Sequence, residues 1–229
     1  LIANVVSAET GRRVGSEITV TGSGSINLPD LSPGSYFVWI RPQYPATTNL
    51  QVRLRAYFGG GVLSGNTPVN FTNAAAGQGV QYTFEAQAGD TLGVALSNVA
   101  TIPATNTNFA TVSVYEPGAT QPIRSDMTCQ NPRCAWSLPD VTKSGAYLIR
   151  IEPYYPHFTL SATLAVSKAV TGTLTRDQPF DLNLDVPGRV AKLKFTTAGG
   201  QHLSLDIGGL TASLAGSNVD VVVKDAAGD

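Results

Sequence analysis

"INLPDLSPGSYFVWIRPQYP" (Ile26–Pro45) returns later in this chain, in altered form, as "WSLPDVTKSGAYLIRIEPYYP" (Trp136–Pro156). Both copies contain Leu-Pro-Asp, then a Gly two residues before a Tyr, then an alternating apolar run and a final Tyr-Pro. Tyr36 and Tyr147 hold equivalent places in the two copies. Such self-similarity indicates a repeated structural unit of about 110 residues.

Other parts of the chain repeat at nearly the same spacing. The matched stretches are Gly61–Phe71 with Gly172–Leu182, Tyr82–Ser97 with Leu193–Gly208, and Ala110–Gly118 with Asn218–Gly228 and, more weakly, with Leu1–Gly11. We therefore expect the chain to start and stop inside a module. We expect residues 1–60 to be the second half of one module, 61–169 a complete module, and 170–229 the first half of another. The two halves complete each other within the chain, pair between chains, or are edges of a longer array, and the sequence leaves these three arrangements open.

The composition is typical of a β-protein. Charged residues make up 14% of the chain, against about 25% in an ordinary soluble domain, and short apolar runs alternate with Gly, Pro, Asn and Asp. Runs of this length and spacing predict a β-sandwich or barrel. No stretch favours a helix strongly.

The repeated motif predicts which side chains fill the core. Successive residues of a strand point to opposite faces, so Tyr147, Ile149 and Ile151 should share one face. The same positions in the first copy are Tyr36, Val38 and Ile40. A buried Tyr needs a partner for its hydroxyl, normally a backbone carbonyl. We expect Phe84 and Leu92 on the facing sheet, with a hairpin turn at Gly89–Asp90.

The order of the motifs carries a family resemblance. "YTFEAQAGDTLGVALS" (from Tyr82), "VSVYEPG" (from Val112) and "WSLPDVTKSGAYLIRIEP" (from Trp136) follow one another as in bacterial pre-peptidase C-terminal domains. The chain also resembles related repeats of large secreted bacterial proteins, including those of the YD-repeat/Rhs type. The resemblance covers nearly the whole chain. It implies an all-β fold of tandem, jelly-roll-like antiparallel β-sandwich modules, each one repeat long, at about 110 residues, in an accessory segment of an exported protein.

Several function classes are disfavoured by the residues themselves. The net charge is −1, and no Lys/Arg cluster offers the phosphate contacts that nucleic acids require. No apolar run approaches the roughly 18 residues of a membrane span. There is no nucleophile elbow, zinc-protease motif, P-loop or EF-hand loop. We therefore expect no catalytic residues, no nucleic-acid partner and no enzyme activity.

Cysteine occurs only in "CQNPRC", as Cys129 and Cys134. A metal site would need further Cys or His ligands nearby, and none flank the pair. When the two Leu-Pro-Asp motifs are aligned, the first copy has Thr19 and Gly24 at these places, so the pair is not chemistry shared by both modules. We expect a disulfide across a four-residue hairpin loop. Such bonds persist in oxidising compartments, which predicts a secreted, extracellular or cell-surface protein.

Aromatic residues are the candidate ligand-binding residues. Tyr44 and the pair Tyr154 and Tyr155 lie in Pro-rich loops, and Trp39 lies in the strand before the first loop. Exposed aromatic rings stack on sugars or grip a protein partner, whereas a Tyr between prolines also plugs the end of its own sandwich. The recurrence of Tyr44 and Tyr155 fits either interpretation, and we favour the plug. Tyr154, which has Gln43 in its place in the first copy, is the better candidate for exposure.

Calcium is the one cofactor for which the sequence offers ligands. Asp177, Asp181 and Asp185 are closely spaced, and oxygen ligands of this kind hold Ca²⁺ in extracellular modules. The competing interpretation is that Asp favours turns through bonds to its own backbone. The first copy has Asn residues in the same region, which favours the turns.

Together these features favour a non-catalytic spacer, scaffold or assembly segment of a large secreted or surface-exposed bacterial protein. Its partners would be neighbouring modules of the same polypeptide or of another copy. One alternative is a module that binds glycan or a matrix protein through the four aromatic residues. Another is an appendage that aids export of a hydrolase.

Overall fold

In the computed structural model, residues 1–21, 26, 28, 31–119, 121–198, 200–213 and 219–224 are described. All the regular elements within these ranges are β-strands, and none of the described residues forms a helix long and apolar enough to cross a membrane. The chain divides into two compact units, Leu1–Lys194 and Phe195–Asp229. The predicted all-β fold is confirmed.

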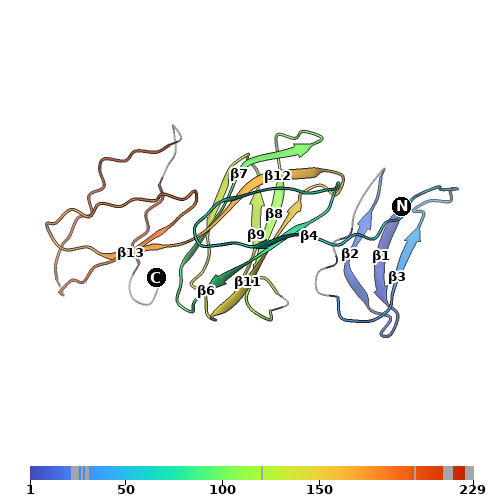
Figure 1. The fold of residues 1–229 in the computed structure, drawn as a ribbon, viewed down its shortest axis with the longest axis horizontal. Coiled ribbons are helices and arrows are strands. Elements are labelled where there is room, and N and C mark those ends of the chain that lie inside the picture. The colour runs from blue at the N-terminus through green and yellow to red at the C-terminus, as the bar shows by residue number, and fades with distance from the viewer. Residues whose placement is uncertain are drawn as a thin grey trace. The chain divides into compact units, whose positions relative to one another are not determined.

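The middle of the chain is a β-sandwich (Figure 1). One sheet has five strands in the order β4-β6-β11-β8-β9, and the other has four in the order β10-β7-β12-β5. The strands are β4 (Phe58–Val62), β5 (Val69–Thr72), β6 (Val80–Ala86), β7 (Leu92–Ile102), β8 (Ala110–Tyr115), β9 (Arg124–Cys129), β10 (Cys134–Ser137), β11 (Gly145–Pro153) and β12 (Thr159–Lys168). All neighbours are antiparallel except β4 and β6, which are parallel.

The core lies between the two sheets and is apolar. On β11 the predicted alternation is confirmed, because Tyr147, Ile149 and Ile151 are completely buried while Leu148 between them is only partly so. The facing side chains come from β7 and β12 and include Leu92, Val94, Leu96, Leu160 and Leu164. Burial of these aliphatic and aromatic side chains is the main force that holds the sheets together.

Two expectations about sheet membership are wrong. Phe84 lies on β6 in the same sheet as Tyr147 and directly opposite it, with ring centroids 5.6 Å apart. The Gly89–Asp90 turn is no hairpin, because it joins β6 of the five-stranded sheet to β7 of the other. Gly89 has a φ of +89°, which a glycine adopts without strain.

The N-terminal sheet repeats part of the sandwich. Strands β1 (Ile2–Ser7), β2 (Arg13–Thr19) and β3 (Tyr36–Arg41) pair in the order β2-β1-β3, just as β9-β8-β11 do. The irregularity between Ala3 and Val5 recurs between Val112 and Val114. The two ladders therefore share order, direction and the place of the bulge, although β2 passes it from Ile18 to Val14 and β9 from Met127 to Arg124, one residue fewer.

This register corrects the alignment around the cysteines. Thr19 lies opposite Ile2, and Thr128 lies opposite Thr111. Thr19 is thus the counterpart of Thr128, and Cys129 corresponds to Val20 instead. Gly24, which the sequence matched to Cys134, lies outside the described residues.

A second ladder also recurs. Strands β13 (Val170–Thr173) and β14 (Ala191–Lys194) are parallel, as β4 and β6 are. Gly172 lies opposite Leu193, just as Gly61 lies opposite Tyr82. Strands β13 and β14 therefore follow β4 and β6 at the same distance in sequence as Tyr147 follows Tyr36. The hydrogen bond from Leu174 N to Lys194 O matches that from Leu63 N to Thr83 O, each 2.7 Å long.

The segment before β14 covers the outer face of the four-stranded sheet. Val186 packs against Ala95 and Ala165. A side chain on Gly93 would collide with the Gly188 carbonyl oxygen, so the backbones approach as closely as glycine allows. These contacts fasten residues 186–189 to the sandwich.

The second compact unit, Phe195–Asp229, differs in character. Its described residues, 195–198, 200–213 and 219–224, form no strand and expose several large apolar side chains. The expected module limits at 60/61 and 169/170 stay a prediction. The first of them falls inside β4.

Candidate functional site

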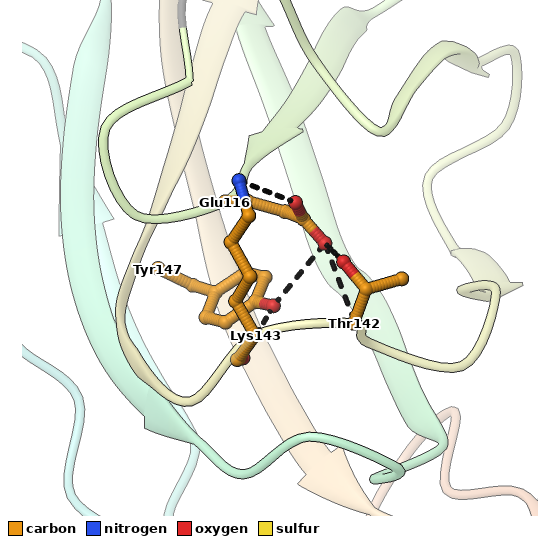
Figure 2. A network of polar contacts seen from close by, with 4 residues as sticks. All are labelled: Glu116, Thr142, Lys143 and Tyr147. Carbon is orange, nitrogen blue, oxygen red and sulfur yellow. Dashed lines mark hydrogen bonds and ion pairs between the residues drawn. The ribbon is translucent and has the colours of Figure 1, made fainter.

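The loop between β10 and β11 is closed by a polar network around Glu116 (Figure 2). The Glu116 carboxylate accepts a hydrogen bond of 2.6 Å from the Thr142 hydroxyl, and the Lys143 ammonium lies 3.5 Å from it. The Tyr147 hydroxyl donates to the Lys143 carbonyl at 2.8 Å. Tyr36 makes the same bond in the first copy, to the Ser32 carbonyl at 2.7 Å. The predicted backbone partner for the buried Tyr is confirmed.

The electrostatics of this network follow from its contacts. The hydrogen bond from Thr142 and the charge of Lys143 hold the pKa of Glu116 below its ordinary value of 4.5. Burial raises the pKa of Tyr147, with a smaller contribution from the nearby Glu116 carboxylate. Both groups keep their usual charge at neutral pH, and the network stabilises a turn.

Glu116→Gln should remove a pH-dependent part of the stability. Because the pKa of Glu116 is lower in the folded chain, its contribution is fully present above the unfolded value and is lost as the pH falls through the folded one. We expect the gap in unfolding free energy between wild type and variant to shrink below pH 4.5 in urea titrations at several pH values. Glu85→Gln, which removes an exposed carboxylate on β6, controls for loss of a charge. A gap that is constant with pH would contradict this role.

Arg150 is a buried residue that the sequence did not single out, and it holds Tyr57 against the five-stranded sheet. The Arg150 guanidinium is nearly inaccessible and lies 4.7 Å from the centre of the Tyr115 ring and 5.7 Å from that of Tyr57. Tyr57 donates a hydrogen bond to Glu152, and burial together with this carboxylate raises the pKa of Tyr57. The sequence feature that could have indicated this site was an Arg placed between two apolar residues, Ile149 and Ile151. The cluster anchors the segment that enters β4.

The structure contains the expected disulfide, but in a different setting. Cys129 ends β9 and Cys134 begins β10, with Cα atoms 5.5 Å apart. These strands are edges of different sheets, so the hairpin interpretation is wrong. Cys129 is completely buried in the core. The bond therefore joins the two sheets along one open side of the sandwich.

The candidate aromatic residues fall into two places. Tyr154 is 42% exposed and meets Tyr155 edge-on, and Tyr155 in turn packs against the buried Phe158, each pair at 5.0 Å. Tyr155 is partly buried in this aromatic cluster. Tyr44 and Trp39 are 74% and 63% exposed.

Trp39 borders an open hollow over β1 and β3. The hollow has a volume of about 470 Å³, and its lining includes Phe37, Trp39 and Arg41. Phe37 and Trp39 share one face of β3, and Val38 lies on the other. An aromatic surface beside a cation is compatible with a planar or polar ligand, and the sequence suggested only Trp39 of this group.

The three candidate calcium ligands do not come together. Asp185 pairs with Arg189 at 2.5 Å, Asp177 lies 3.3 Å from Arg176, and Asp181 is exposed. Within the described part of the chain, no group of three acidic, His or Cys side chains could hold a metal ion. These aspartates have positive neighbours or solvent around them, so calcium is not part of the proposed function.

Comparisons with known proteins give similarity in structure only. No family model and no curated protein matches the chain. The pre-peptidase C-terminal domain of a Bacillus anthracis collagenase is 14% identical, with a TM-score of 0.35, and covers 50% of this chain and 100% of its own. Two periplasmic inhibitors of g-type lysozyme also match, PliG of Aeromonas hydrophila (17% identity, TM-score 0.33) and of Salmonella Typhimurium (16%, 0.32), each over 49% of this chain and 100% of its own.

These similarities are too low to carry an argument about function. One neighbour is a domain of the kind that the sequence resembles. The YD-repeat/Rhs part of that resemblance stays a prediction.

Proposed function

We propose that the chain is a non-catalytic scaffold or spacer segment of a secreted or cell-surface bacterial protein, built from tandem β-sandwich modules. The recurrence of two strand ladders supports this most directly. Strands β2-β1-β3 repeat β9-β8-β11 with a bulge at the same place, and β13-β14 repeat β4-β6. Repeated units stacked along one chain give extended proteins whose length scales with the number of units.

The contacts of two polar groups, the buried Arg150 and the half-buried Glu116, agree with a structural role. Arg150 packs between two tyrosine rings, and Glu116 closes a turn. The disulfide favours an oxidising compartment, because cytosolic thiols are normally kept reduced. Each of these features is explained by the stability of the sandwich.

Ligand binding is the second candidate function, and the exposed aromatics favour it. Trp39 borders the hollow over β1 and β3, and Tyr154 is partly exposed at a loop of the sandwich. Aromatic rings supply stacking surfaces for sugars and anchors for protein partners.

Binding assays separate the two candidates. Wild type, Trp39→Ala and Tyr154→Ala are applied to a glycan array and to immobilised collagen, with Val62→Ala as a control that removes an exposed apolar side chain from β4. For a scaffold we expect no saturable binding and no difference among the four proteins. Saturable binding that is lost in either aromatic variant, but kept in Val62→Ala, would replace the scaffold role by ligand binding.

A further inference from the structure

Two strands outside the sandwich have a free edge within the described chain, although the strands that correspond to them in the sandwich pair with each other. Within the described residues β3 pairs only with β1, and β14 pairs only with β13. Their counterparts β11 and β6 pair with each other in the five-stranded sheet. An unpaired edge presents backbone donors and acceptors that can take another strand.

The side chains beside these edges are exposed although their counterparts form the core. Val38 on β3 is 52% exposed, whereas its counterpart Ile149 is completely buried. The same holds after β14, where three exposed side chains correspond to three buried ones. These pairs are Leu203 with Leu92, Leu205 with Val94, and Ile207 with Leu96. The N-terminal sheet and the segment after β14 thus each expose apolar side chains that correspond to half of a sandwich core.

We propose that β3 of one copy of this chain pairs with β14 of a second copy. The sandwich supplies the register, since Tyr147, Ile149 and Ile151 lie opposite Phe84, Tyr82 and Val80. Replacing each residue by its repeat counterpart places Tyr36 opposite Phe195, Val38 opposite Leu193, and Ile40 opposite Ala191. The sheet would then run β13-β14-β3-β1-β2, the order of the complete sandwich, and the following segment 203–207 would cover its apolar face. This inference rests on the proposed scaffold role and names the partner of its assembly.

The places where the N-terminal half-module and β14 join the sandwich favour pairing of β3 with β14 of a second copy over pairing with β14 of the same chain. The sequence match of the two copies continues after their Tyr-Pro, where Leu50 and Leu54 match Leu160 and Leu164 of β12. Only a short linker therefore separates the N-terminal half-module from Tyr57, which bonds to Glu152 at one end of β11. The chain's own β14 is fastened at the opposite end, where Lys192 pairs with Asp140 at 2.5 Å. β11 has nine residues, which separates these ends by roughly 25 Å.

The contact would use different surfaces of the two partners. A head-to-tail contact of this kind generates open chains or rings, in contrast to a symmetric dimer. The mode is addition of a strand to a sheet edge, with side chains on one face giving specificity. The chain in solution should therefore form oligomers, as open chains or closed rings, whose proportion grows with protein concentration.

Cysteine pairs test the partner and the register together. A Val38→Cys chain and a Leu193→Cys chain are mixed under mild oxidation, and the products are mapped by peptide mass spectrometry. We expect a covalent dimer linked through positions 38 and 193. Val38→Cys mixed with Lys194→Cys is the matched control, because the register places Lys194 opposite Phe37 and on the other face. Equal yields in both mixtures would overturn the proposal. The double variant V38C/L193C should join into covalent multimers, and a purely intramolecular bond in it would show that the chain completes itself.

Sedimentation velocity tests the apolar face without cysteines. Val38→Asp should weaken self-association at least about tenfold, because an unpaired charge would enter an apolar interface. Phe37→Asp is the control, since Phe37 is similarly exposed but lies on the other face of the same strand. A wild type that stays monomeric at about 100 µM, well above a micromolar affinity, or equal behaviour of the two variants, would contradict the proposal. Ligand binding in the glycan and collagen assays would defeat the scaffold role whether or not the chain self-associates.

Discussion

Tyr147→Ala should destabilise the sandwich by about 3–5 kcal/mol, the range for removal of a large aromatic side chain from a core. The Tyr147 ring is completely buried and lies against Phe84, with centroids 5.6 Å apart. Its loss leaves a cavity between the sheets and deprives the Lys143 carbonyl of its 2.8 Å hydrogen bond. Domains of this size have total stabilities of about 5–15 kcal/mol, so the change is a large fraction. Equilibrium urea denaturation would measure it.

Two further variants locate the origin of this loss. Tyr147→Phe keeps the ring and removes only the hydroxyl, so we expect a loss of about 1 kcal/mol. Tyr36→Ala removes the equivalent Tyr from the first copy, which makes the same kind of hydrogen bond but is only partly buried. At concentrations where the chain is monomeric, its cost should be well below that of Tyr147→Ala. Equal losses at Tyr36 and Tyr147 would show that packing in the sandwich core is not the cause.

Removal of the disulfide in the double variant Cys129→Ala/Cys134→Ala should lower the free energy of unfolding by about 2 kcal/mol, because the closed loop is short and the entropy it removes from the unfolded chain is small. The sequence separation between the cysteines is five residues. The bond joins the edges β9 and β10 of different sheets. Thermal unfolding followed by circular dichroism would record the lower melting temperature.

A reducing agent provides the control for the double variant. Reduced wild type should match it, and the variant itself should not respond to reductant. A wild type whose melting temperature is unchanged by complete reduction would contradict a stabilising role for this bond.

Some of the fold could be predicted because it depends on local geometry. The alternation of Tyr147, Ile149 and Ile151 follows from the strand backbone, in which every second side chain shares a face. The bond of the Tyr147 hydroxyl to a carbonyl four residues earlier is local as well. The register of the repeat was recognised to within one residue. The alignment around Cys129 shifts because β2 has one residue more than β9 at the bulge they share.

The candidate ligand-binding residues were harder to predict. Tyr44 is exposed and Tyr155 is partly buried, although both residues lie in the same repeated motif. The reason is that packing depends on neighbours, and the described environment of Tyr155 includes Phe158. Asp177 and Asp185 likewise have arginine partners that a ligand pattern does not reveal.

The sequence by itself determined the all-β class, the face that each side chain of β11 presents, and the repeat of about 110 residues. These properties follow from covalent geometry and from the spacing of apolar residues. Only the tertiary structure decided sheet membership. It placed Phe84 beside Tyr147, made Gly89–Asp90 a crossing between sheets, and turned Cys129–Cys134 from a hairpin link into a bond between sheet edges. Strand pairing joins backbone groups far apart in the chain, and the side-chain pattern of one strand does not specify which edge its backbone will meet.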